Sequence, residues 1–343
     1  MTHDLPQPSA PDRVIDVHTH LYPRTYLDLL SQRDTAPRVE RRDGLELLHI
    51  FEGENGRVVD EGFWSVDAKL EFMERSGIDQ SVVSLGNPWL EAFEPAESVA
   101  IAKDLNAELA CMESDTGGRL VGMGCLPSGS VEQIVQTIVD VAGTQGLHGV
   151  VSGTRVGGLQ FDDDGLDPVW SALAETRTPL LVHPHFGLGL SSMDGFGHSL
   201  PLALGFTFET TTALSRLAMS GVLDAHPDLL VIGSHGGGTI PYLAGRLDAC
   251  WAPDEAARAR RQLSPTSALS RLYLDALVYH PRALRAVADL VSPQQMVFGT
   301  DHPFAIADPE VNIASIRETF GSTEARNVFS VTAQRLFCLP DIS

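Results

Sequence analysis

Short apolar runs alternate with amphipathic stretches along most of the chain. The apolar runs are rich in β-branched residues and show no clean polar alternation, which is typical of strands buried on both faces. Eight strands are predicted, at Val14–Val17, Ser81–Leu85, Leu120–Gly124, Gly149–Ser152, Pro179–Val182, Leu229–Gly233, Leu272–Ala276 and Met296–Gly299. Helical spacing lies between them, for example at Val66–Ser76, Ser98–Asp115, Val131–Ala142, Thr210–Ser220 and Pro281–Val291. Eight repeats of strand and helix predict a (β/α)8 TIM barrel of the α/β class.

The chain is longer than a bare barrel. A barrel needs about 250 residues, whereas the chain has 343. We therefore expect a single domain over residues 1–343, with a flexible N-terminal segment at 1–12 and long insertions at 21–65 and 184–204, after the first and fifth strands. Both insertions follow strand C-termini, on the face where barrels place their active sites. The second insertion is rich in Gly and Ser and is predicted to form a lid.

Charge and composition restrict the partners. The 24 basic and 45 acidic residues give a net charge of −21, which argues against nucleic acid, because phosphate contacts need Lys and Arg. An anionic substrate would need local cations. The chain has no run of 18 apolar residues and no apolar, basic leader, so we expect no membrane partner and a cytoplasmic location. The four cysteines are widely spaced, and we expect reduced core thiols.

Histidine and aspartate side chains follow several of the predicted strands. His18 and His20 end the first strand, two residues apart, so both imidazoles can point to the same side. His183 ends the fifth strand, His235 the sixth, and Asp301 follows the eighth. Because the ends of parallel strands meet at one face of a barrel, these groups are expected to form one metal site.

The ligand types predict the metal. Three imidazoles and one carboxylate, without a thiolate, suit Zn²⁺ first, and Mn²⁺, Co²⁺ and Fe²⁺ are alternatives. Catalytic zinc keeps one position for water and lowers its pKa toward 7. His235 is either a fourth imidazole ligand or the acid/base beside the metal, and we favour acid/base, because His titrates near neutrality. The only lysines, Lys69 and Lys103, fall in predicted helices, so neither can bridge two metals on a strand. A single metal is expected, and the scarcity of lysine also argues against a Schiff base.

At this point the motifs resemble a known family. HTH after strand one, HP after strand five, HGGG after strand six and TDHPF after strand eight look like the amidohydrolase superfamily. The segments GTRVGG (153–158) and HGGGTIPYLAGRLD (235–248) are similar to its decarboxylase branch, typified by aminocarboxymuconate semialdehyde decarboxylase. The resemblance implies that His18, His20, His183 and Asp301 bind one divalent metal, usually zinc. It also implies that His235 is the catalytic acid/base, with Asp301 beside it in the catalytic centre.

Two arginines are carried over from the same resemblance. Arg246, in the segment after HGGG, matches an arginine that binds a substrate carboxylate and that the partner subunit can supply, so a homodimer is expected. Arg57, seven residues before Trp64, lies in a stretch that resembles the second substrate-binding arginine of the family. A planar guanidinium that grips a carboxylate at two points is suited to such a substrate.

The expected activity is non-oxidative decarboxylation of a small aromatic or unsaturated carboxylic acid. A hydrolase or hydratase that uses the same metal site is the first alternative, and release of CO₂ against uptake of water separates the two. A metal-binding barrel without activity is the second. The roles of His185, His198, His302 and Asp275 stay open: Asp275 is either a partner of a ligand histidine or a satisfied core residue, and His198 could contact substrate.

Overall fold

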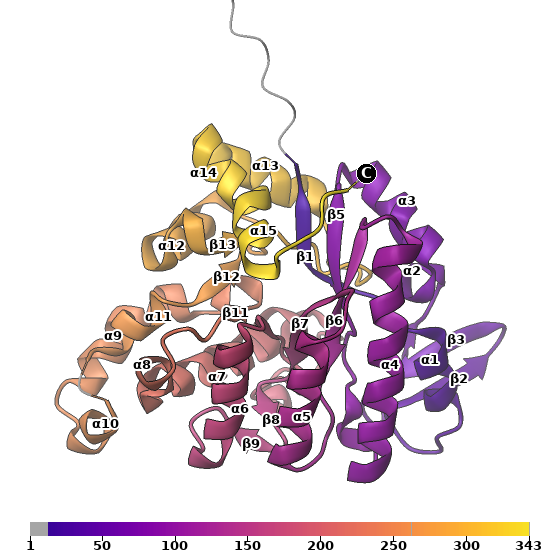
Figure 1. Cartoon of the computed structure of the whole chain (residues 1–343), viewed down its shortest axis with the longest axis horizontal. Helices are drawn as coiled ribbons and strands as arrows, with labels where there is room; N and C mark the ends of the chain where they lie inside the picture. The colour runs from indigo at the N-terminus through magenta and orange to yellow at the C-terminus, as the bar shows by residue number, and fades with distance from the viewer. Residues whose placement is uncertain (1–12, 262, 343) are drawn as a thin grey trace, which may run out of the picture.

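Eight parallel strands form the central sheet of the computed structural model, which describes residues 13–261 and 263–342. Their order in the sheet follows the chain, β1-β5-β6-β7-β10-β11-β12-β13, and the helices pack around them (Figure 1). Each strand lies at a predicted position, which confirms the (β/α)8 architecture. The bounds are β1 (Ile15–His20), β5 (Gln80–Ser84), β6 (Leu120–Cys125), β7 (Leu147–Ser152), β10 (Leu180–Val182), β11 (Val231–Gly233), β12 (Tyr273–Asp275) and β13 (Met296–Val297).

Backbone hydrogen bonds join the first strand to the segment that follows the last one. The Val17 N–H donates to the Phe298 carbonyl at 3.0 Å, and the Thr300 and Asp301 N–H groups both donate to the His18 carbonyl, at 3.1 and 2.7 Å. These bonds nearly close the barrel. They also bring the first and eighth strand ends side by side, so His18 and Asp301 become neighbours although they are far apart in sequence.

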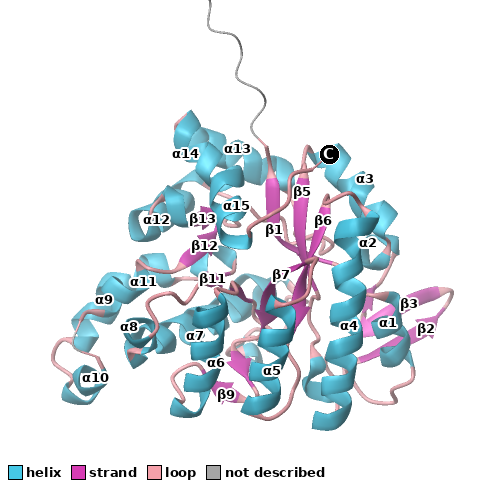
Figure 2. Ribbon diagram, viewed as in Figure 1, coloured by secondary structure: helices cyan, strands magenta, loops and turns pink. Residues whose placement is uncertain are grey.

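Helices lie on the outside of the sheet (Figure 2). α3 (Val66–Ser76), α5 (Val131–Ala142) and α12 (Pro281–Val291) have the predicted bounds. The Ser65 hydroxyl caps α3 and a Ser130–Gln133 capping box begins α5, since these side chains satisfy free N–H groups of the first turn. α4 (Pro95–Asp115) and α7 (Phe206–Ser220) begin earlier than predicted. The other helices are α6 (Asp167–Thr176), α8 (Val222–Ala225), α9 (Ile240–Trp251), α10 (Glu255–Arg260), α11 (Pro265–Leu269), α13 (Pro309–Thr319), α14 (Ser322–Arg326) and α15 (Thr332–Phe337).

The insertion after the first strand contains its own small sheet. Three antiparallel strands, β2-β3-β4, lie between the helices α1 and α2, and Leu48 of β3 pairs with Arg57 of β4. This pairing holds the Arg57 backbone in an extended conformation beside the barrel. The bounds are α1 (Arg24–Ser31), β2 (Arg38–Arg42), β3 (Leu45–His49), β4 (Arg57–Val58) and α2 (Glu61–Trp64).

Residues 184–204 follow β10 as a loop with two short helical turns, η3 (Leu190–Ser192) and η4 (Pro201–Gly205). Its role as a lid stays a prediction. A further hairpin, formed by β8 (Arg155–Val156) and β9 (Leu159–Gln160), follows β7 and was not anticipated from the sequence. The predicted flexible segment at 1–12 lies outside the described residues.

Two expectations from composition can be compared with the structure. In the part of the chain that is described, no helix combines the length and apolar character needed to cross a membrane. All four cysteines are free, but only Cys125 is buried, and Cys111, Cys250 and Cys338 are exposed. The prediction of core thiols is therefore wrong for these three, which lie at outward-facing positions of helices or helix ends.

Candidate metal centre and active site

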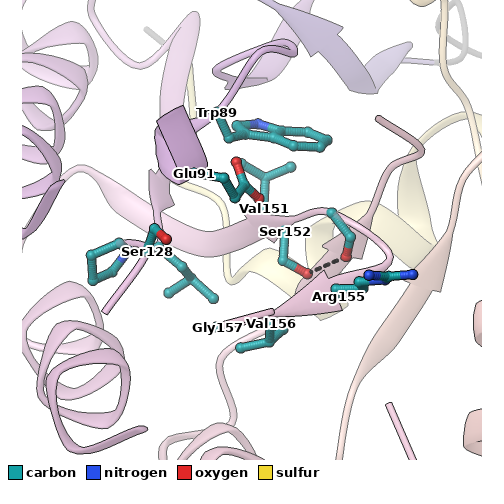
Figure 3. Close-up of a pocket in the computed structure, with 11 residues that line it drawn as sticks. Trp89, Glu91, Ser128, Val151, Ser152, Arg155, Val156 and Gly157 are labelled. Carbon is teal, nitrogen blue, oxygen red and sulfur yellow. Dashed lines mark hydrogen bonds between the residues drawn. The ribbon is translucent and has the colours of Figure 1, made fainter. Parts of the chain in front are cut away.

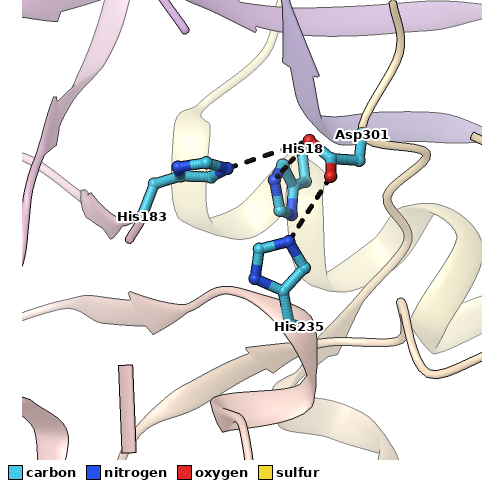
Figure 4. Close-up of side chains that lie close together, drawn as sticks. All are labelled: His18, His183, His235 and Asp301. Carbon is cyan, nitrogen blue, oxygen red and sulfur yellow. Dashed lines mark hydrogen bonds and ion pairs between the residues drawn. The ribbon is translucent and has the colours of Figure 1, made fainter. Parts of the chain in front are cut away.

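Four histidines surround the Asp301 carboxylate at the C-terminal ends of the strands. The Nε2 atoms of His20, His18 and His183 lie 3.2, 3.3 and 3.8 Å from the same oxygen, Asp301 Oδ1. The Nε2 atom of His235 lies 3.4 Å from the other oxygen, Oδ2. Figure 4 shows that the side chains of His18, His183 and His235 approach the carboxylate from different elements. The strand-end rule thus brought together all five predicted residues.

The spacing of these donor atoms suits a cation. Ligands held about 2.1 Å from a tetrahedral metal are separated by about 3.4 Å, close to the distances that converge on Asp301 Oδ1. The Nε2 atoms of His18 and His183 are buried and hydrogen-bond to no described residue, and a metal would satisfy both. The donor atoms of His18, His183, His235 and Asp301 all lie within 4.8 Å of one another, and His20 reaches the same carboxylate. The centre is a site of three histidines and one aspartate for a divalent metal.

Burial and charge set the protonation of the side chains in this centre. Burial lowers the pKa of His20 to about 4 and that of His183 to about 3, so both rings keep the free lone pairs that a metal needs. Burial would also lower the pKa of His18, but the charge of Asp301 and a hydrogen bond to Asp275 outweigh it and raise the pKa to about 10. The pKa of Asp301 lies well below its usual value, because the His18 charge outweighs burial. The site therefore favours positive charge between His18 and Asp301, where a cation would replace the proton.

Asp275 at the end of β12 connects His18 to His235. Its Oδ2 atom accepts hydrogen bonds from His18 Nδ1 at 2.6 Å and from the His235 N–H at 2.8 Å. Its Oδ1 atom accepts from the Gly236 and Leu277 N–H groups, at 2.7 and 3.1 Å. A carboxylate on Nδ1 leaves the His18 Nε2 lone pair free for a metal. The structure thus shows that Asp275 is a hydrogen-bond partner of His18, a histidine of the candidate metal centre.

Two residues of the centre have a left-handed backbone, with φ of +54° at His235 and +60° at Asp301. Such conformations cost of order 1–3 kcal/mol for residues other than glycine and persist only where the surroundings hold them. Hydrogen bonds from the His235 N–H to Asp275 and from the Asp301 N–H to the His18 carbonyl hold them here. Gly236 has φ of +62°, and a Cβ there would lie 2.4 Å from Val278 Cγ1, so HGGG needs a glycine at this position.

A cavity of about 880 Å³ opens beside the centre, within the range of small-molecule sites. His183, His235 and Asp301 form part of its lining, together with largely apolar side chains that include Phe304. Arg57 also lines it: its guanidinium lies 4.5 Å from the centre of the Phe304 ring. The Nη1 atom of Arg57 is buried and has no hydrogen-bond partner among the described residues. This arrangement presents an unpaired positive charge to the cavity.

Asn87 is a lining residue that the sequence analysis missed. It is 1% exposed, and its Nδ2 atom donates to no other group in the described part of the chain, so an amide donor is available at the cavity wall. A signal was present, because Asn87 comes shortly after a strand end on the same face as the histidines. His198, in the 184–204 loop, lines the cavity as well, and its contact with substrate stays a prediction.

Three other predicted or open residues lie away from the cluster. Arg246 is exposed on α9 and does not line the cavity of its own chain. His185 is buried and stacks on Phe186 with ring centres 4.0 Å apart. His302 follows Asp301, but its Nδ1 atom lies 2.6 Å from Lys69 Nζ and its ring stacks on Phe72. Neither His185 nor His302 belongs to the metal-binding group.

A second hollow lies beside Trp89 (Figure 3). Its volume is about 20 Å³, and Glu91, Ser128, Ser152 and Arg155 are among its lining residues. A space of this size holds about one water molecule. It is therefore too small for a substrate, and the large cavity is the better candidate.

Comparisons with known proteins agree with this geometry. A model of the amidohydrolase family matches residues 15–339. The 2-amino-3-carboxymuconate-6-semialdehyde decarboxylase of Dictyostelium discoideum is 26% identical over 326 residues, which cover 93% of this chain and 90% of that protein. The crystal structure of IDCase from Metarhizium anisopliae in its apo form has a TM-score of 0.90 and 33% identity, with 96% and 98% of the two chains covered. A dihydroxybenzoic acid decarboxylase from Polaromonas sp., crystallised with manganese and the inhibitor 2-nitroresorcinol, has a TM-score of 0.76 and 19% identity, with 96% and 97% covered, and shows the same fold.

Proposed function

The chain belongs to the amidohydrolase family, and from that premise we propose that it is a metal-dependent, non-oxidative carboxy-lyase for a small aromatic or unsaturated carboxylic acid. The observation that carries the proposal is the position of His235. Its Nε2 atom faces Asp301 Oδ2 at the edge of the metal centre, and it lines the same cavity as the Arg57 guanidinium. A proton donor, a cation site and a carboxylate-binding group thus meet in one largely apolar space.

His18, His20, His183 and Asp301 are the residues that would hold the metal. The three Nε2 atoms share one carboxylate oxygen, whereas the His235 Nε2 atom lies beside the other oxygen. His235 also lines the cavity, where it is available for proton transfer. A bound divalent ion supplies positive charge that orients and polarises oxygen atoms of the acid. The ligand types favour Zn²⁺, and Mn²⁺ suits them as well; manganese is bound in the Polaromonas enzyme.

The residues of the chain perform the remaining steps. Arg57 holds a carboxylate or another anionic oxygen of the substrate, and Asn87 donates a hydrogen bond nearby, which positions the acid. His235 delivers a proton to the carbon that carries the reacting carboxylate, forming the new C–H bond. The C–C bond to the carboxylate then breaks, its electron pair returns to the ring or diene, and CO₂ leaves. The balance is one carboxylate and one proton consumed for one C–H product and one CO₂.

Arg246 is proposed to act in the cavity of a partner subunit. It is exposed on α9, and Asp248, the nearby acidic residue, accepts a hydrogen bond from the Thr266 N–H instead of pairing with it. In a two-fold homodimer each subunit can give the same residue to the other. Mixing Arg57→Ala and Arg246→Ala chains tests this directly, because one of the two sites in each heterodimer then carries both arginines. Activity should return to about a quarter of the wild-type value, and mixed chains that stay inactive would contradict a role in trans.

The assay that tests the function compares two products. The metal-loaded protein is screened with salicylate-like, resorcylate-like, isoorotate-like and muconate-like acids, and CO₂ release is followed together with incorporation of ¹⁸O from labelled water. A carboxy-lyase releases CO₂ in amounts equal to the decarboxylated product and incorporates no label into it. Label in the product without CO₂ would show a hydrolase or hydratase instead. The same screen with His235→Asn, whose metal content is measured in parallel, assigns the turnover to this site.

A further inference from the structure

Lys69 is one of two lysines in the chain and is completely buried, with 0% of its surface exposed. Charged side chains are almost never fully buried unless they are paired. Lys69 lies on α3, which packs outside the barrel. Its amino group nevertheless points inward and contacts residues next to the metal centre. The proposed reaction has no use for this residue, so its burial calls for another explanation.

The amino group of Lys69 contacts the two segments that carry metal ligands. On the first strand, Nζ donates to Thr19 Oγ1 at 2.8 Å, and Thr19 stands between His18 and His20. After the eighth strand, Nζ lies 2.6 Å from His302 Nδ1 and 3.4 Å from the His302 carbonyl, and His302 follows Asp301. One side chain thus joins segments that are far apart in sequence.

The bonds around this contact tie it to the ligands. The His302 carbonyl accepts from the His20 N–H at 2.7 Å and from Thr19 Oγ1 at 3.2 Å. Asp301 itself has a left-handed backbone, with φ of +60°, and needs support from its neighbours. Because an amino group of lysine in its usual state only donates, the contact leaves His302 Nδ1 as the acceptor and fixes the orientation of the ring, which stacks on Phe72.

We propose that Lys69 is a positioning residue of the metal centre, which bridges Thr19 and His302 and thereby holds the HxH ligands of β1 at the right distance from Asp301. A shorter or apolar side chain would leave Thr19 and His302 without this common donor. The ligand-bearing ends of β1 and of the segment after β13 could then move apart. The inference rests on the proposed metal site, but it is independent of which acid is decarboxylated.

The test measures metal binding before activity. Lys69→Met keeps the length of the side chain and removes the donor, and Lys103→Met, at an exposed position of α4, is the matched control. Partners of metal ligands typically contribute about 10- to 100-fold to affinity, and Lys69 acts on the ligands through their chain neighbours Thr19 and His302. The Zn²⁺ Kd, measured by competition with a chromophoric chelator, should therefore rise about tenfold, the low end of that range, in Lys69→Met only. The absorption spectrum of the Co²⁺-loaded protein should change as well, since it reports ligand geometry. We expect kcat to fall more than KM rises, because the cavity groups are untouched.

Thr19→Val provides a second variant if Lys69→Met fails to fold, because it removes the hydroxyl that accepts from Lys69 and donates to the His302 carbonyl with almost no change in shape. It should weaken Zn²⁺ binding and alter the Co²⁺ spectrum in the same direction, and adding it to Lys69→Met should cost little more, since both break one network. A folded Lys69→Met protein with wild-type Zn²⁺ affinity and Co²⁺ spectrum would overturn the inference. If that variant does not fold, a Thr19→Val protein with wild-type Zn²⁺ affinity and Co²⁺ spectrum would overturn it instead. Failure of the wild-type chain to bind Zn²⁺, Mn²⁺ or Co²⁺ would instead overturn the proposed function.

Discussion

Replacing Asp275 by asparagine exchanges one oxygen of a fully buried carboxylate for an amino group and leaves the shape of the side chain nearly unchanged. Both oxygens accept two hydrogen bonds, Oδ2 from His18 Nδ1 and the His235 N–H, and Oδ1 from the Gly236 and Leu277 N–H groups. Neither orientation of the amide can satisfy all four donors. The variant must therefore leave either two backbone donors or the His18–His235 side without an acceptor.

The magnitude follows from the two orientations. If the amide nitrogen faces Gly236 and Leu277, two buried N–H groups lose their acceptor, at about 1–3 kcal/mol each. If it faces His18, the imidazole must turn its Nδ1 lone pair toward the amide and place its proton on Nε2, where the metal binds. In the second case affinity for metal should fall about 10- to 100-fold. The first orientation therefore costs a few kcal/mol of stability. The second costs about one order of magnitude or more in metal affinity.

The assay combines chelator competition for Zn²⁺ with urea unfolding of the metal-free protein, so that both outcomes are detected. Asp254→Asn is the control, since Asp254 caps α10 at an exposed position and asparagine caps helices equally well. The control should match the wild-type chain in both measurements. An Asp275→Asn protein with wild-type metal affinity and wild-type unfolding free energy would refute the assignment of Asp275 as the link between His18 and His235.

Three further predictions concern catalysis, metal and pH. His235→Asn should lower kcat by about 10²- to 10⁴-fold with unchanged metal content, and equal turnover in the metal-loaded variant would contradict the acid/base role. Removing the metal with a chelator should abolish CO₂ release. It should also lower the free energy of unfolding by about 2.7 kcal/mol relative to protein at a free metal concentration of 100 Kd, and adding Zn²⁺ or Mn²⁺ should restore both. A metal-free protein that turns over as before would exclude the metal from the reaction. Hydrogen bonds from Arg24, and then from Arg41, hold the pKa of Glu46 at about 2 although partial burial opposes them. Because the folded pKa of Glu46 is depressed, the stability that its ion pairs contribute is present above pH 4.5 and is lost as pH falls through 2. Glu46→Gln should therefore lower the free energy of unfolding by about 0.5–1 kcal/mol at pH 7 after solvent screening. Urea titrations that show the same loss at pH 7 and near pH 2 would count against the ion pairs.

The sequence alone determined the barrel and most of the metal centre. Strands buried on both faces must be apolar throughout, so all eight were visible as short runs, and amphipathic spacing gave the bounds of α3, α5 and α12. The ligand positions followed from one topological fact, that parallel strands end on the same face. His18, His20, His183, His235 and Asp301 could therefore be grouped without knowledge of any contact.

Only the tertiary structure decided the roles of residues whose neighbours come from distant segments. From the sequence, Asp275 could equally be a core residue, and only the structure shows that its carboxylate accepts a hydrogen bond from His18. The sequence placed Lys69 on a helix, but did not show that its amino group contacts Thr19 and His302. His302 was next to Asp301 in sequence, but its ring turns to Phe72. The physical reason is that strand order and periodicity depend on local backbone geometry. The hydrogen-bond partners of buried polar groups depend instead on how helices and insertions pack against the sheet. That packing produces no periodic pattern in the sequence.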